Sequence, residues 1–174
     1  MAIVELLRGH LQRLHRSYEE AVQGLTPEQL HWRPGKGCNH IAFTIWHYAR
    51  TADNVSRFVL QNRRPTVWTE GGWDKKFGLD RAAQGTGMSQ EEATAIRLPS
   101  VEAFLPYMQR VWRAVDEYLN SINDDALSKI VTIRPQGELP VGQILTTVLL
   151  THGFSHLGEL WMLRGLQGFK GSPI

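Results

Sequence analysis

The stretch THGFSHLGELWMLRG, residues 151–165, places His152 and His156 four positions apart in a segment of helical periodicity. Apolar residues recur at three- and four-residue steps on either side of the pair, so both imidazole rings are expected to face the interior. The helix is predicted to open at Pro140, to run from Val141 to about Leu166, and to be followed by a glycine. The periodicity therefore predicts one long C-terminal helix.

Three further segments show the same periodicity. The first covers residues 3–22, the second starts with Asn39 as N-cap and runs to Gln61, and the third follows the N-cap Ser100. Long helices joined by longer connections are typical of a four-helix bundle, so we expect an all-α fold with one domain over residues 1–174. The alternative is a looser three-helix core with a decorated crossover.

The connections carry their own signals. Residues 62–88, between the second and third helices, form a long segment rich in Gly and Trp that is predicted to be an irregular loop. The sequence TPEQL predicts a short helical turn capped by Thr26, and Ser89 with Glu92 forms a capping box. The stretch SKIVTIRPQGELP, residues 128–140, is compatible with a small hairpin before the fourth helix.

Composition restricts the partners and the compartment. The net charge is only +2 and the basic residues are scattered, so we expect no nucleic-acid partner. No stretch approaches the ~18 apolar residues of a membrane span, and the N-terminus lacks the apolar run of a signal peptide. Cys38 is the only cysteine, which favours a reducing cytoplasm. We therefore expect a soluble cytoplasmic protein whose partner is a small molecule.

Two histidines on one helix face could hold a metal. Zinc accepts nitrogen ligands at about 2.0–2.1 Å, and a catalytic site uses three protein ligands with one open position. Spacing alone supports the metal site no better than a second hypothesis, in which His152 and His156 are core residues with ordinary hydrogen bonds. Glu159 could be a ligand, an acceptor for an imidazole N–H or a solvated residue. A third ligand must come from elsewhere, and periodicity does not choose among His10, His15, His31, His40 and His47.

Two quoted stretches resemble a known family. LTPEQLHWRPGKGCNHIAFTIWHYARTADNV, residues 25–55, and THGFSHLGELWMLRGLQG, residues 151–168, are similar to the first and last signatures of the DinB-like (DinB/YfiT) superfamily. The resemblance implies a four-helix bundle and a metal triad at His47, His152 and His156. It also implies a divalent metal, with zinc as the default and nickel as the alternative, and a homodimer. The family has a small residue where this chain has His40, which leaves His40 as a pocket residue or a surface one.

Three functional hypotheses follow. The first, taken from the thiol-dependent branch that the chain resembles, is S-transfer to an electrophile, or its isomerisation, with a low-molecular-weight thiol. The second is a metal-dependent hydrolase with Glu159 or His40 as proton carrier. The third is a non-catalytic binding or stress-response bundle whose metal is structural and has Glu159 as fourth ligand. The residues do not decide whether the chain is an enzyme.

The pocket is expected where the second and fourth helices meet beneath residues 62–88. Arg50 could meet an anionic substrate there or form an ion pair, and Cys38 could be an activated thiol or a structural residue. Aromatic residues predicted either to line this pocket or to pack in the core are Trp32, Trp46, Trp68, Trp73 and Phe77.

Overall fold

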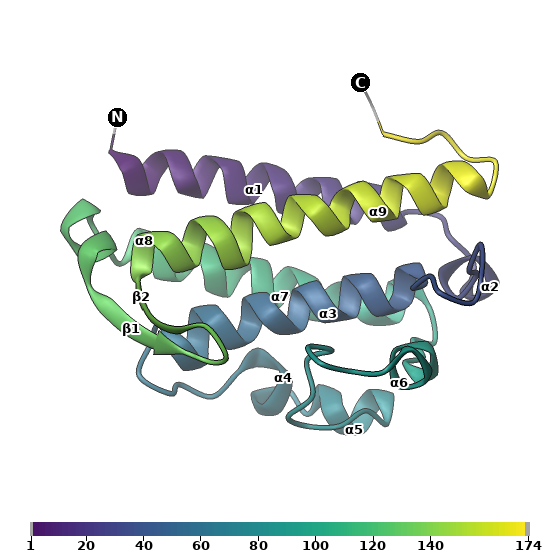
Figure 1. Ribbon diagram of the computed structural model, residues 1–174, viewed down its shortest axis with the longest axis horizontal. Helices are drawn as coiled ribbons and strands as arrows, with labels where there is room; N and C mark the ends of the chain where they lie inside the picture. The colour runs from purple at the N-terminus through teal and green to yellow at the C-terminus, as the bar shows by residue number, and fades with distance from the viewer. Residues whose placement is uncertain (1, 173–174) are drawn as a thin grey trace.

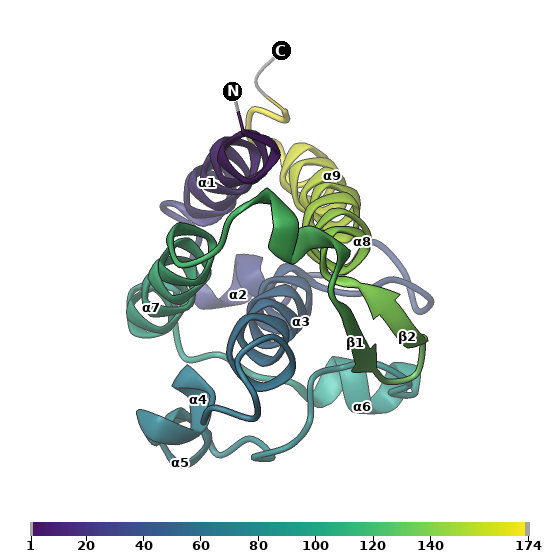
Figure 2. The same cartoon turned by 90° about the vertical axis from the view of Figure 1, so that its left-hand side faces the viewer.

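Long helices dominate the computed structural model, which describes residues 2–172. Helix α1 (Ile3–Val22) packs against α7 (Val101–Asn120) and α9 (His152–Leu166), and α3 (Ile41–Asp53) contacts the same two helices (Figures 1 and 2). The predicted mainly helical architecture is confirmed. Within the described residues, none of the helices is long and apolar enough to cross a membrane.

Helix α1 presents one apolar face to the core and lacks a side-chain cap of its own. Leu11 and Leu14 are fully buried, whereas Ile3 and Leu6, at the N-terminal end of the predicted stripe, are exposed. The backbone N–H groups of Ile3 and Val4 donate to the carboxylate of Asp124 at 3.0 and 2.9 Å. This acceptor comes from η2 (Asp124–Ser128), so the start of α1 is capped by a residue distant in sequence.

Helix α3 is the central helix, and every residue from Ile41 to Asp53 is buried. Its predicted N-cap, Asn39, is wrong by one residue: His40 occupies the cap, and its Nδ1 accepts from the N–H of Phe43 at 2.9 Å. An imidazole nitrogen can serve here because a cap needs only an acceptor within reach of the first turn. The helix continues as a π-helical segment, η1 (Asn54–Val59).

The segment between α3 and α7 is more ordered than predicted. It contains α4 (Val67–Glu70) and α5 (Trp73–Phe77), followed by α6 (Gln90–Ala95), which starts at the predicted capping box. The buried carboxylate of Asp53 accepts from the N–H groups of Val67 and Trp68, both at 2.8 Å, and from the Tyr107 hydroxyl at 3.0 Å. The start of α4 is thus held by a carboxylate of α3 rather than by periodicity of its own.

The predicted small hairpin is present. Strands β1 (Ile130–Ile133) and β2 (Gly137–Pro140) pair antiparallel, and β1 contacts η1 beyond the end of α3 (Figure 2). The last helical segment then runs through α8 (Val141–Gln143) and the π-helical η3 (Ile144–Thr151) into α9. The predicted turn at TPEQL is α2 (Pro27–Leu30), capped by Thr26.

Candidate metal centre

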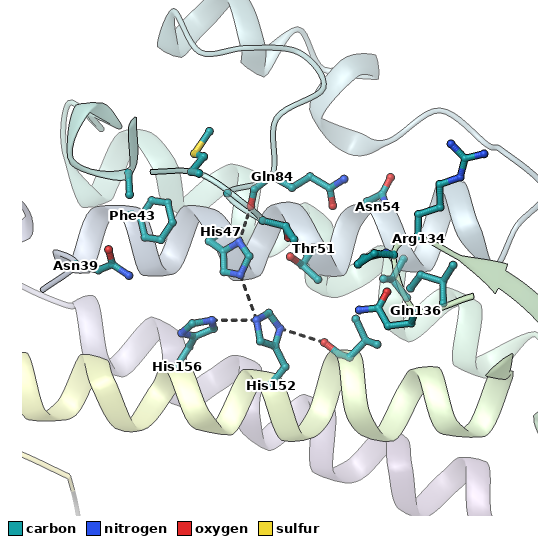
Figure 3. A pocket seen from close by; sticks show the side chains of 18 of the residues that line it. Asn39, Phe43, His47, Thr51, Asn54, Gln84, Arg134, Gln136, His152 and His156 are labelled. Atoms are coloured by element: carbon teal, nitrogen blue, oxygen red, sulfur yellow. Dashed lines mark hydrogen bonds between the residues drawn. The ribbon is translucent and has the colours of Figure 1, made fainter. Parts of the chain in front are cut away.

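Three histidines converge between α3 and α9. The Nε2 atom of His152 lies 3.1 Å from Nε2 of His47 and 2.9 Å from Nε2 of His156. His47 comes from the middle of α3, and the other two lie one turn apart at the start of α9 (Figure 3). The three form a group that could hold a metal ion, because their candidate ligand atoms all lie within 4.8 Å of one another.

The opposite ring nitrogens fix the orientation of these rings. Nδ1 of His47 lies 2.5 Å from the carbonyl oxygen of Gln84, and Nδ1 of His152 lies 3.2 Å from that of Val148. Nδ1 of His156 lies 2.8 Å from the carboxylate of Glu159. All three partners are acceptors, so each Nδ1 carries the proton and each Nε2 of the neutral ring presents a lone pair.

The lone pair on Nε2 of His152 faces those of His47 and His156 at about 3 Å, and no hydrogen lies between them to share. A divalent cation satisfies all of them at once, and neutral imidazole is a ligand that zinc, copper, iron and nickel accept. Tetrahedral coordination with zinc–nitrogen bonds of 2.0–2.1 Å separates two ligand nitrogens by about 3.3 Å. The donor set and its spacing therefore fit a metal ion, and the cluster allows a metal site.

Burial keeps two of the rings neutral. It lowers the pKa of His47 from 6.5, against a smaller raising effect of the hydrogen bond to Gln84. Burial also lowers the pKa of His152 to about 4, and the neighbouring rings of His156 and His47 add to that shift. Neutral imidazole is the form that binds a metal, so both rings are available as ligands at neutral pH.

Residues 81–85 form a loop segment whose backbone contacts the ring of His47. The backbone at Gly85 has φ +94°, and a Cβ there would come within 2.7 Å of Nδ1 of His47, so glycine is required. The guanidinium of Arg50 donates to the carbonyl oxygens of Ala83 and Arg81, both at 3.1 Å, and lies 3.7 Å from the carboxylate of Asp53. Arg50 is buried and ion-paired, so of its two predicted roles the structure shows the ion pair.

A cavity of about 740 Å³, here called the histidine cavity, opens onto the three rings. It lies between α3 and the last helical segment, as predicted. Of the segment 62–88 that is predicted to cover it, only the end, from Gln84 to Met88, lines it, and the turn of the hairpin closes a further side. None of the five predicted aromatic residues lines it. Trp46 and Trp68 are fully buried in the core, where Trp68 and Trp73 stack on Phe77. The apolar wall is formed instead by Phe43, Val55, Met88, Ala93, Ile133 and Val148.

The two candidate proton carriers lie away from the Nε2 atoms. His40 is only 1% exposed and is not among the residues that line the histidine cavity, so it is neither a pocket residue nor a surface one. Its Nδ1 caps α3, and its Nε2–H donates to the carbonyl oxygen of Thr94 at 3.3 Å. Glu159 meets His156 at Nδ1, the side of the ring opposite the cluster, so it orients His156.

The remaining sequence candidates lie apart from the cluster. His15 is buried and stacks on Trp112 with ring centroids 4.0 Å apart, and Nε2 of His31 accepts from the N–H of Leu98. Cys38 is an exposed free thiol that does not line the histidine cavity. No sequence pattern points to Gln84, because it contacts His47 through a backbone carbonyl that every residue type shares.

The DinB superfamily profile matches residues 10–160, most of the chain. The chain belongs to the DinB superfamily. No protein with a curated description matches the chain. The fold of this DinB-superfamily protein is similar to the crystal structure of a conserved protein from Enterococcus faecalis, with a TM-score of 0.81 and 21% identity over 95% of this chain and 97% of the other. At that identity the likeness shows the fold alone.

Proposed function

We propose that this DinB-superfamily protein is a metal-dependent enzyme that uses a low-molecular-weight thiol, which it transfers to a small electrophile or uses to assist its isomerisation. The site is the cluster of His47, His152 and His156, within one four-helix-bundle domain over residues 1–174. The observation that carries the proposal is the convergence of three Nε2 lone pairs at the floor of a cavity. Zinc is the proposed metal and nickel the alternative.

The three histidines would hold the metal, and the cavity leaves room for a further ligand. A divalent metal supplies a positive charge that stabilises a thiol as its nucleophilic thiolate at neutral pH. Gln84, Val148 and Glu159 keep the rings in the ligating tautomer through their Nδ1 atoms. The ring of Phe43 lies parallel to that of His47, with centroids 5.7 Å apart, and gives the cavity an apolar wall beside this ring.

The lining of the histidine cavity favours a thiol over water as nucleophile. None of its lining residues, within the part of the chain that the structure describes, is Asp or Glu. A hydrolase needs a group that carries protons between the attacking water and the leaving group, and neither His40 nor Glu159 faces the cavity. A thiol has a pKa of about 8.5 and reaches its nucleophilic form with electrostatic help alone.

The homodimer expected from the family resemblance remains a proposal. The apolar surplus of α3 is buried within the chain and so is not available for an interface. Exposed apolar side chains do occur on α1 and α9, which lie side by side: Ile3, Leu6, Phe154, Met162 and Leu166. Light scattering of the purified protein would test the dimer.

The first test is metal content. Protein purified without a chelator or a histidine tag should contain about one equivalent of metal, and the His47→Ala and His152→Ala variants should contain almost none. No metal in the parent, and none after addition of zinc or nickel, would overturn the proposal.

The second test is activity of the metal-loaded protein. With an activated aryl halide as electrophile, the thiolate should form a C–S bond and release halide, with the thiol proton going to solvent, only when the metal is present, and the His152→Ala variant should be inactive. Metal-dependent ester hydrolysis without any thiol requirement would instead establish the hydrolase.

A further inference from the structure

A second hollow adjoins the histidine cavity on the side of the hairpin. It measures about 720 Å³ and shares Asn54, Gln84, Ile133 and Arg134 with the histidine cavity. Its other walls come from η1 and the residues just after it, including Phe58, Asn62 and Arg63, and from Thr132 of β1. We call it the arginine hollow. A ligand that fills the histidine cavity can extend into it past the shared residues.

The charged side chains that line the two spaces, apart from histidines, are all positive. Among the residues that the structure describes, and apart from histidines, Arg134 is the only charged residue that lines the histidine cavity, and Arg63 and Arg134 are the only two that line the arginine hollow. Across residues 2–172, neither guanidinium lies within ion-pair distance of a carboxylate. The hairpin's acidic residue, Glu138, pairs with Thr132 in register but lines neither space. Within the described part of the chain, the hollow therefore presents two arginines without a carboxylate partner.

Arg63 has a backbone conformation that is unfavourable for a residue with a side chain, which is evidence for a functional role. Asn62 and Arg63 adopt φ of 51° and 62°, the left-handed region that favours glycine, just beyond the end of η1. The N–H of Arg63 closes that turn by donating to the carbonyl oxygen of Phe58 at 2.8 Å. Glycine would adopt this conformation without strain, and strained non-glycine residues are concentrated at functional sites.

Arg134 approaches the same space from the opposite side. It follows β1 at the turn of the hairpin, and Figure 3 shows Arg134, Gln136 and Asn54 toward one end of the histidine cavity and His156 toward the other. An elongated ligand with its reacting atom at the histidines would therefore carry its far end to the arginines. Guanidinium groups match a carboxylate through paired N–H donors.

We propose that the arginine hollow binds the carboxylate of an elongated organic acid whose other end reaches the three-histidine cluster, with Arg63 and Arg134 as the anion-binding residues. This inference rests on the proposed function for the identity of the reacting end, whereas the carboxylate site stands on the geometry of the hollow. The three-histidine cluster alone does not indicate which substrates bind. The arginine hollow adds that the substrate is a small molecule with one anionic terminus.

The binding test uses mercaptoalkanoates of increasing chain length and the matching mercaptoalkanols, titrated calorimetrically into zinc-loaded protein. Above a minimum chain length the carboxylate compound should bind about tenfold more tightly than the alcohol, and the preference should shrink as salt is raised. Arg134→Gln and Arg63→Gln should each lower the preference at least about threefold. Arg64→Gln is the matched control, because it removes the same charge from the next residue, which lines neither space.

A metal-free arm separates this inference from the proposed function. Adipate should bind the metal-free protein weakly, in the millimolar range, shift the amide resonances of residues 62–64 and 132–136, and lose that binding in Arg134→Gln. If thiols fail to bind zinc-loaded protein while adipate behaves in this way, the proposed function falls and the carboxylate site stands. Equal binding of acids and alcohols, or adipate binding that is the same in wild type and Arg134→Gln, overturns the carboxylate site.

Arg63→Gly gives a further distinction. It should raise the melting temperature, because glycine relieves the left-handed strain, and should still weaken carboxylate binding. A variant that is stabilised but binds acids as tightly as wild type would show that Arg63 has no part in the site.

Discussion

Two groups of histidines lie in this protein, and their rings are equally close. The ring centroids of His31 and His40 are 5.2 Å apart, and those of His47 and His152 are 5.1 Å apart. In the first pair every ring nitrogen has a complementary partner: Nδ1–H of His31 donates to Pro27 and Nε2–H of His40 to Thr94, while the other two nitrogens accept backbone N–H groups. In the cluster, each inward nitrogen faces another acceptor.

The difference shows that proximity of histidines does not by itself make a metal site. A backbone cap and a carbonyl satisfy the first pair completely, so a cation would gain nothing there. In the cluster the acceptors on the Nδ1 side fix the protons outward and leave the Nε2 side short of positive charge. The outer partners of the rings therefore distinguish a metal centre from a structural contact, and the two groups should respond differently to substitution.

The largest contrast is expected from removal of one inward-facing ring. His152→Ala should lower zinc affinity by more than about 100-fold, the upper end of what changes outside the ligand shell cause, because it deletes the central donor. His31→Ala is the matched control, since it removes a ring from the satisfied pair and should leave metal content unchanged. Competition with a zinc-binding dye measures both affinities. Equal losses in the two variants would contradict the distinction between the groups.

Acid should weaken the metal-free protein through both groups. Burial lowers the pKa of His40 to about 4, from an ordinary value of 6.5, and the pKa of His152 is also about 4. The unfolded chain binds these protons near pH 6.5 and the folded chain only near pH 4, so the free energy of unfolding falls as the pH drops through that window. The loss should total about 3 kcal/mol after allowance for partial solvent contact.

Urea denaturation across that pH range measures how the free energy of unfolding changes with pH. His40→Asn should remove the part of that change that comes from His40. Bound zinc should make the profile steeper, because protons and metal compete for the same Nε2 atoms. A profile that stays flat from pH 6.5 to 4 would show that neither ring is shielded from protons.

The sequence was informative wherever a pattern is local. His152 and His156 share a helix face by spacing alone, and Ser89 with Glu92 and Ser100 mark helix starts that the structure confirms. His47 was chosen from five candidates only through the family resemblance, because which helix meets the last one is a property of the fold. Arg134 was missed for the same reason: the hairpin lies far from both signatures in sequence and reaches the cavity only after folding.

The errors in the fold have a similar origin. Helices α4 and α5 are too short for periodicity to reveal. Residues of α3 hold α4 in place: Asp53 accepts from its first backbone N–H groups, and Arg50 lies over the ring of Trp68. Asn39 has the stronger general preference for an N-cap, yet His40 occupies it because its Nε2 also meets Thr94 of α6. For Trp68 and Trp73 the sequence leaves pocket and core open, and the structure confirms the core, where their partners are Tyr107 and Phe77.

A smaller effect is expected from the carboxylate behind the cluster. Glu159→Gln keeps an acceptor for Nδ1 of His156 but removes the charge, and the side chain is 45% exposed, so zinc affinity should fall about tenfold or less. Glu91→Gln, an exposed glutamate on α6, is the control and should change nothing. The same dye competition serves here. A loss as large as that in His152→Ala would mean that Glu159 is a metal ligand rather than an orienting residue.

The smallest effect on metal binding is expected at His40, where the effect should be on stability alone. His40→Ala leaves the N–H of Phe43 without its acceptor and opens a gap beside His31, so it should cost about 1–2 kcal/mol of unfolding free energy. His40→Asn retains an acceptor and should cost less than about 1 kcal/mol. Zinc affinity should be unchanged in both variants, because His40 does not line the histidine cavity. If either variant lost catalytic activity while keeping its metal and its fold, His40 would be part of the reaction path, and a satisfied hydrogen-bond pattern could no longer separate structural histidines from functional ones.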